Sequence, residues 1–327
     1  MRKLVMTLVT FFFFSVVIFV LGLMQWSEKE NQVTSSLSNN EQQYITPEEF
    51  GANGQDKKDD SKAIQEAIDY SVKENIGTVY LSGNKRYILT SGIVIREKVE
   101  VKMDQNTKIY VEGDFRVFDL KRNASITNGM IEVTTPTFHS EVVYLDGSEK
   151  YWSTERTRVH NVTVFNSSGS HRGTGIALSA EKPGDYISFV NVSDVTIVGF
   201  HQGILLKATQ RIKDDQYTWV NGNRFTNITL DDCVRCIELI GNVTVPNETS
   251  GNQFNQLQIQ VSTITEKALV VSGSSNQFDG IVWDAHLAGN DTALVDLTSQ
   301  SADNEVHLNL VKKQVSNDGT RNEYSGP

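Results

Sequence analysis

Apolar residues recur in short, alternating runs along the last third of the chain. Four runs, the last of them degraded, start with an asparagine that is followed two residues later by an apolar residue; the asparagines are Asn223, Asn252, Asn276 and Asn304. They lie 29, 24 and 28 positions apart, and self-similarity at this period indicates a solenoid. The alternation inside each run is typical of strands. The pattern predicts a parallel β-helix, in which each strand pairs with its counterpart one coil further on.

Each of the first three runs is followed by a second apolar run, at 237–239, 269–271 and 294–297. An asparagine at one place in every coil is expected to form an internal ladder, because its amide can bond the asparagines above and below and the backbone at the bend. The phenylalanines two residues further on are expected to face inward too. Weaker runs predict earlier coils at 124–133, 142–145, 159–165, 176–178, 187–198 and 204–206.

One amphipathic helix is predicted before the strands. Asp60 or Ser61 can cap it, its apolar face carries Ala63, Ile64, Ala67 and Ile68, and Gly77 follows its end. A β-helix has an open hydrophobic end, so we expect this helix to cover that end.

The N-terminus carries an uncharged, apolar run at 4–26, long enough at helical rise to span a bilayer. Its length, and the lack of a small-x-small site after it, favour an uncleaved signal-anchor over a cleaved signal peptide, which stays open as the alternative. Arg2 and Lys3 precede the run, so the positive-inside rule places everything after it outside the cell. Residues 27–43 are polar and predict a flexible stalk.

Charge and composition narrow the function classes. The net charge is −10, and basic residues do not cluster, which argues against a nucleic-acid partner. Cys233 and Cys236 give only half of a zinc site, so a buried or turn pair is the favoured interpretation. Eight Asn-x-Ser/Thr sequons are explained by the repeat itself rather than by glycosylation. Two longer polar stretches, 147–158 and 209–222, are expected to be surface loops, where function commonly lies.

The entry to the strands also matches a known pattern. Phe50-Gly-Ala-x-Gly, the Asp59-Asp60 pair, the helix at 63–68 and Gly77-Thr-Val-Tyr-Leu resemble the N-terminal entry of pectate-lyase-like right-handed parallel β-helix proteins. That superfamily includes polygalacturonase-type glycoside hydrolases and phage tailspike depolymerases. The strict resemblance covers about 44–110, with departures at 55–58 and 82–86, and the repeats extend it loosely to about 310. The resemblance implies the fold and a polysaccharide partner. The matching residues form the N-terminal cap and not a functional site, so they do not specify an activity.

The predicted organisation is therefore a signal-anchor or transmembrane helix at 1–26, a stalk at 27–43, an all-β right-handed parallel β-helix with an N-terminal helical cap at 44–315, and a polar tail at 316–327. The sequence leaves the oligomeric state open.

Candidate catalytic residues come from aligning the repeats on their phenylalanines. Asp231, Gln260 and Asp284 then fall in one column. Coils are stacked about 4.8 Å apart, which puts Asp231 and Asp284 about 10 Å from each other. Inverting glycosidases separate their carboxyl groups by about 6.5–9.5 Å, and Asp232 could narrow the gap. The competing interpretation is that these are ordinary solvent-facing turn residues.

Five further residues are candidates for substrate binding: Arg235, Glu238, His286, Trp283 and Tyr217. The polygalacturonase resemblance implies Asn-Thr-Asp, Asp-Asp, Gly-His-Gly and Arg-Ile-Lys in that order. Here Arg211-Ile-Lys precedes the Asp231-Asp232 pair and Gly-His-Gly is missing, so that machinery is not carried over. No cofactor or metal is expected, unless the protein is a Ca²⁺-dependent lyase that uses Asp214, Asp215 and the Asp231-Asp232 pair with Arg235.

The sequence thus predicts a membrane-anchored extracellular protein that cleaves or modifies a polysaccharide, as a glycoside hydrolase or, less favoured, a lyase. The alternative class is a non-catalytic surface protein that binds glycans or acts as an adhesin or spacer.

Overall fold

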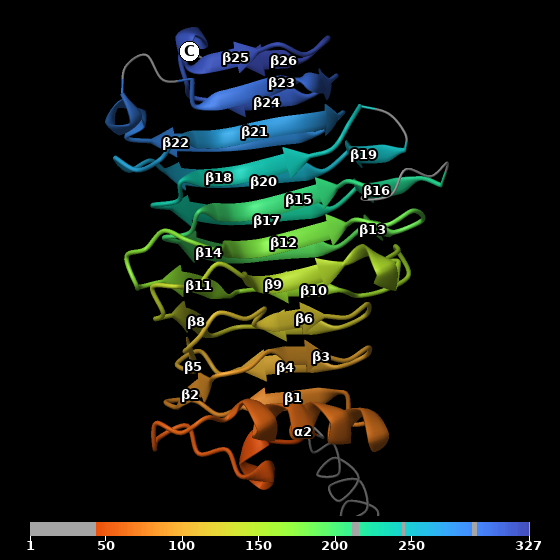
Figure 1. Ribbon diagram of the computed structural model, residues 1–327, viewed down its shortest axis with the longest axis vertical. Coiled ribbons are helices and arrows are strands. Elements are labelled where there is room, and N and C mark those ends of the chain that lie inside the picture. Colours follow the sequence, from red (N-terminus) through yellow and green to blue (C-terminus); the bar gives the residue numbers. More distant parts are fainter. Residues whose placement is uncertain (1–43, 211–215, 244–245, 290–292, 327) are drawn as a thin grey trace, which may run out of the picture. The chain divides into compact units, whose positions relative to one another are not determined.

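The computed structural model describes residues 44–210, 216–243, 246–289 and 293–326 (Figure 1). Residues 44–327 form one compact unit. The predicted membrane helix and stalk, 1–43, lie outside the described residues. No helix in the described part is long and apolar enough to cross a membrane.

The unit is a stack of coils in which successive strands pair in parallel, as predicted for a β-helix (Figure 1). The described strands form a 14-stranded and a 12-stranded sheet. The larger sheet contains β1 (Thr78–Leu81), β2 (Arg86–Leu89), β4 (Glu100–Met103), β5 (Lys108–Val111), β7 (Ser125–Thr127), β8 (Met130–Val133), β10 (Arg158–His160), β11 (Thr163–Asn166), β14 (Asn191–Val198), β17 (Arg224–Asp231), β20 (Gln253–Gln260), β22 (Gln277–Trp283), β24 (Glu305–Leu308) and β26 (Glu323–Ser325).

The smaller sheet has a main column of strands and a short side column. The main column contains β3 (Ile93–Ile95), β6 (Phe118–Leu120), β9 (Glu141–Asp146), β12 (Thr174–Ala180), β15 (Gln202–Ala208), β18 (Arg235–Ile240), β21 (Lys267–Ser274), β23 (Val295–Ala302) and β25 (Val315–Asn317). The side column contains β13 (Tyr186–Ser188), β16 (Thr218–Asn221) and β19 (Asn247–Ser250).

The predicted asparagine ladder is present inside the coils. Asn223, Asn252 and Asn276 are fully buried, and each side-chain amide donates to the Oδ1 of the next asparagine at 2.9–3.0 Å. Each amide also donates to a buried backbone carbonyl, such as that of Val220 for Asn252 at 3.0 Å. The ladder therefore satisfies backbone groups at every bend, which is why the repeat keeps this residue.

The predicted inward phenylalanines stack on one another beside the ladder. The Phe225 and Phe254 rings are 4.4 Å apart and the Phe254 and Phe278 rings 4.9 Å apart, both nearly parallel. The strand register pairs all three rings, so the stack follows directly from the sequence repeat.

The expected polar tail at 316–327 needs correction, because the stack continues into it. Strand β26 pairs with β24, and β25, which starts at Val315, pairs with β23. Asn304 donates to Asn322 at 2.8 Å, so Asn322 adds a further rung to the ladder. The repeat is hidden in the sequence because this rung follows after only 18 residues.

The polar stretch 209–222, expected to be a loop, contains a strand. Residues 218–221 form β16, which pairs with β13 and β19. The segment 211–215, with its Arg211-Ile-Lys motif, lies outside the described residues.

The predicted helix is α2 (Ser61–Lys73), and it follows the short 3-10 helix η1 (Pro47–Phe50). Its buried apolar face carries the predicted Ala63, Ile64, Ala67 and Ile68. Asp60 is the N-cap residue, but its side chain makes no capping hydrogen bond. It accepts hydrogen bonds from the backbone of Asn53 and Ile88, at 2.9 and 3.1 Å, and so ties the helix start to the neighbouring chain. Helix α2 is drawn beside β1 at the N-terminal end of the stack (Figure 1). Three more 3-10 helices are η2 (Gly147–Glu149), η3 (Ala285–Ala288) and η4 (Lys312–Gln314).

Candidate functional site

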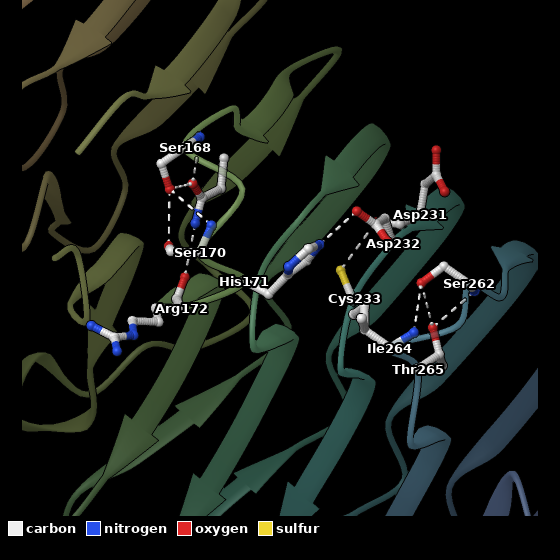
Figure 2. Close-up of polar contacts among 11 residues, drawn as sticks. Ser168, Ser170, His171, Arg172, Asp231, Asp232, Cys233, Ser262, Ile264 and Thr265 are labelled. Carbon is white, nitrogen blue, oxygen red and sulfur yellow. Dashed lines mark hydrogen bonds and ion pairs between the residues drawn. The ribbon is translucent and has the colours of Figure 1, made fainter. Parts of the chain in front are cut away.

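The carboxylates Asp231 and Asp232 lie at the turn between β17 and β18. Asp231 is the last residue of β17, and Asp232 has a φ of 52°, which turns the chain. The Asp232 carboxylate Oδ2 lies 2.7 Å from Nε2 of His171 in the turn between β11 and β12. Figure 2 shows the Asp232 side chain directed at His171, while the Asp231 carboxylate points away from this pair.

The His171–Asp232 contact crosses the turn of the coil between them. His171 and Asp232 each stand five residues before a register-matched isoleucine, Ile176 or Ile237. The residue at the same place in the intervening turn is Gly199, with a φ of 82°. A Cβ at Gly199 would lie 2.7 Å from the carbonyl oxygen of Asn166, so this turn packs closely on the end of β11.

The pKa of the Asp231 carboxyl is shifted upward. Partial burial raises the pKa of its carboxyl above the ordinary 3.8, and the neighbouring Asp232 carboxylate raises that pKa further. A raised pKa keeps a carboxyl protonated at higher pH, which a general acid requires.

The predicted column of Asp231, Gln260 and Asp284 is shifted by one residue at its third position. The register pairs Asp231 with Gln260 and Gln260 with Trp283. Strands β17 and β20 each contain a bend residue with positive φ, whereas β22 has one residue fewer there and a register shift. At that point Gly280 approaches the Leu257 backbone so closely that a Cβ would lie 2.3 Å from its carbonyl oxygen.

Asp284 nevertheless lies beside this column. Its carboxylate accepts a hydrogen bond from Nε2 of Gln260 at 2.8 Å. Trp283 is 50% exposed, and its indole N–H donates to Gln258 at 2.7 Å. The edge after β17, β20 and β22 therefore carries a carboxyl, an amide, a second carboxylate and an exposed aromatic side chain.

Arg235 and Glu238 form a second polar group, on β18. Arg235 donates to Glu238 at 2.7 Å, and Glu238 also accepts from Gln202 on β15 at 2.5 Å. Gln202 in turn accepts from Thr174 on β12 at 3.0 Å. The Glu238 side chain is only 8% exposed, so this network ties adjacent strands together and offers a ligand mainly the guanidinium of Arg235.

Two predicted binding residues lie apart from these groups. Tyr217 precedes β16, at the opposite end of β17 from Asp231, so the structure does not bring it to the carboxylates. His286 is exposed on η3, two residues beyond Asp284.

Within the described residues, the two cysteines are buried, and the carboxylates considered as calcium ligands do not form a metal site. Cys233 and Cys236 are free, fully buried thiols, and burial raises the pKa of Cys233 to about 12. Asp214 and Asp215 lie outside the described residues. Among the residues that are described, no three His, Cys, Asp or Glu side chains are placed to hold a metal ion.

Sequence reasoning missed two features. His171 is not among the candidate residues named from the sequence, although counting back from the strand start aligns it with Asp232. Four aromatic residues were also missed: Trp152, Tyr186, Phe189 and Trp219 cluster on and next to the side column. Trp152 and Trp219 lie in the stretches 147–158 and 209–222, which were expected to be loops, whereas Tyr186 and Phe189 lie at or next to the start of the predicted coil run 187–198.

Comparison with known proteins returns a phage depolymerase, a bacterial surface protein and a phage tailspike protein. Over 84 residues the chain is 37% identical to a capsule KN3-specific depolymerase of Klebsiella phage KN3-1, which covers 26% of this chain and 10% of that protein. The chain thus spans about a tenth of the length of the curated relative it matches. No protein-family model matches.

Among solved structures, the Streptococcus pneumoniae surface protein and adhesin PfbA is 12% identical, with 86% of each chain covered and a TM-score of 0.43. A mutant tailspike protein of E. coli bacteriophage HK620, in complex with a pentasaccharide, is 11% identical, covering 88% of this chain and 63% of that chain with a TM-score of 0.38. At these scores neither likeness carries a functional argument. The resemblance to pectate-lyase-like proteins is confirmed at the level of the parallel β-helix, which the strand register itself establishes.

Proposed function

We propose that residues 44–327 act on an extracellular polysaccharide as a glycoside hydrolase, with the edge after β17, β20 and β22 as the site. The observation that carries this proposal is the raised pKa of Asp231, which lies along the same edge as Asp284. Gln260, on the coil between them, pairs with Asp231 and bonds Asp284. Two coil steps of about 4.8 Å suggest roughly 10 Å between the two residues, near the separation at which inverting glycosidases admit a water. The phage depolymerase relative supports a polysaccharide partner.

The proposed reaction is a single displacement. The protonated Asp231 carboxyl gives its proton to the glycosidic oxygen while the Asp284 carboxylate takes a proton from a water. The water oxygen bonds to the anomeric carbon as the glycosidic C–O bond breaks, and the released sugar carries the proton from Asp231. Solvent then returns a proton to Asp231 and removes one from Asp284. Gln260 positions the Asp284 carboxylate, and Trp283 offers a face for a sugar ring.

The surrounding parts follow from the sequence. We propose that residues 4–26 anchor the chain in the cell membrane, or are cleaved after export, and that the β-helix unit lies outside. We also propose that α2 covers the N-terminal end of the coils, because its apolar face would otherwise meet water.

A screen of the full chain tests the proposal. Purified protein is incubated with acidic and neutral polysaccharides, including KN3-type capsule, and reducing ends and unsaturated products are followed. Release of reducing ends without unsaturated product, abolished in Asp231→Asn and Asp284→Asn, is the expected result. Unsaturated product would identify a lyase. No turnover on any polysaccharide by a folded protein would overturn the catalytic assignment.

The competing function is a non-catalytic, glycan-binding surface protein. One observation favours it: the His171–Asp232 contact joins turns two coils apart, as a purely structural strut would. Under this alternative the protein binds a polysaccharide in the same screen, and all of its aspartate variants bind equally well.

A further inference from the structure

A group of partly exposed aromatic side chains outside the carboxylate edge lies on and next to the side column. Trp152, Tyr186, Phe189 and Trp219, here called the aromatic strip, come from three successive coils. Tyr186 and Trp219 are register partners, and their rings stack 4.8 Å apart at an interplanar angle of 8°. Trp152 meets Tyr186 and Phe189 edge to face at 6.0 and 5.2 Å.

The strip faces outward and is held in place. Trp152 is 45% exposed although it follows the fully buried Tyr151, whose backbone bridges to Ile187. The indole N–H of Trp219 donates to Ser188 at 3.1 Å, and Ser188 donates to Asn221 at 2.5 Å. The rings are therefore preorganised on a rigid sheet, so binding would cost little side-chain entropy.

Polar side chains lie along one side of the aromatic strip, and the Glu248 carboxylate lies at its end next to Trp219. Ser188, Asn221 and Ser250 are register partners on successive strands. Glu248 is the register partner of Trp219 on β19, and it accepts a hydrogen bond from Ser250. Ser188 is buried, whereas Asn221 and Ser250 are partly exposed and can bond the hydroxyl groups of a ligand. Glu248 and the net charge of −10 disfavour an anionic ligand.

We propose that the aromatic strip binds a stretch of uncharged sugar residues, apart from the carboxylate edge. The apolar faces of pyranose rings pack on the aromatic rings, and their hydroxyl groups bond Asn221, Ser250 and Glu248. One coil step is comparable to one sugar unit, so an extended chain can contact successive coils. This proposal rests on the proposed function, in that the partner is a polysaccharide, and it adds a neutral subsite to it.

The experiment measures binding and cleavage separately. The full chain carrying Asp231→Asn, which blocks the proposed cleavage, is titrated calorimetrically with hexasaccharides of glucose, galactose and mannose and with a polygalacturonate fragment. Binding of at least one neutral hexasaccharide in preference to polygalacturonate is expected. Trp152→Ala should weaken it roughly tenfold, as truncation of a central aromatic anchor does, and Trp152→Tyr should retain most of it.

Tyr44→Ala is the matched control, since Tyr44 is 47% exposed but lies at the N-terminal end of the unit, and its affinity should equal that of the parent. Circular dichroism checks that each variant folds. Neutral-sugar binding that Trp152→Ala leaves unchanged, or no binding of any neutral probe, overturns the proposal. Light scattering that shows self-association lost in Trp152→Ala also overturns it, because a second copy would then occupy the strip. Binding without wild-type cleavage rejects only the carboxylate mechanism.

Discussion

The interior of the coils and the turns that carry the carboxylates differ in how strictly they repeat. Inside, four asparagines in succession donate to the next rung with the same geometry, at 2.8–3.0 Å. The turns that separate equivalent strands vary in length, since 167–173 and 261–266 are longer than 199–201 and 232–234. Residues that repeat from coil to coil therefore belong to the scaffold, because each of them occupies the same buried position in its coil. A contact that is made once and is not repeated from coil to coil, such as that of His171 with Asp232, is where a specific role can be placed.

Truncating the phenylalanine stack should have the largest effect on stability. Phe254→Ala removes a fully buried ring sandwiched between Phe225 and Phe278, so the free energy of unfolding should fall by about 3–5 kcal/mol. Urea unfolding followed by circular dichroism measures it. Phe254→Leu should lose much less, and equal losses in the two variants would contradict the stacking account.

Breaking the asparagine ladder should come next. Asn252→Ala leaves the amide and backbone N–H of Asn223 and the carbonyl of Val220 without their partner, at a cost of about 2–3 kcal/mol. Asn255→Ala, on the outward face of β20, the strand that follows Asn252, is the matched control and should change stability little. The same unfolding measurement decides, and a control as damaging as Asn252→Ala would show that the buried ladder is not special.

The turn contact should matter far less for stability. His171→Ala removes a partly exposed contact between an imidazole and a carboxylate, worth about 1 kcal/mol or less. His201→Ala, an exposed histidine in the neighbouring turn, is the control. A loss of several kcal/mol in His171→Ala alone would identify a structural strut and favour the non-catalytic alternative.

The smallest effect is expected from Asp231. Because its folded pKa is raised, stability is greatest when it is protonated in both states and falls as the pH rises through the folded pKa. Asp231→Asn should therefore be slightly more stable than wild type at neutral pH, and the difference should vanish below about pH 3.8, the ordinary value. Melting temperatures across pH 3–7 measure this. A variant that is less stable at neutral pH would contradict the raised pKa.

The sequence predicted the interior far better than the edge, for a physical reason. The asparagine at Asn252 and the phenylalanine at Phe254 recur in neighbouring coils, because each coil needs the same side chain at the same buried position. That recurrence is visible in the sequence. The position of Asp284 could not be read off, since one missing bend residue in β22 shifts every residue after it. Asn322 was missed because its coil is short, and Trp219 because the strand that carries it lies in a polar stretch.

The most direct test of the account is the rate of reducing-end release by wild type and Asp231→Asn on one polysaccharide that the wild type cleaves. A general acid contributes about 10²–10⁴ in rate, so the variant should fall by roughly a hundredfold or more while it still binds the polysaccharide. The wild-type rate should also decline on the alkaline side, as Asp231 loses its proton. Turnover in Asp231→Asn equal to that of wild type would contradict the account.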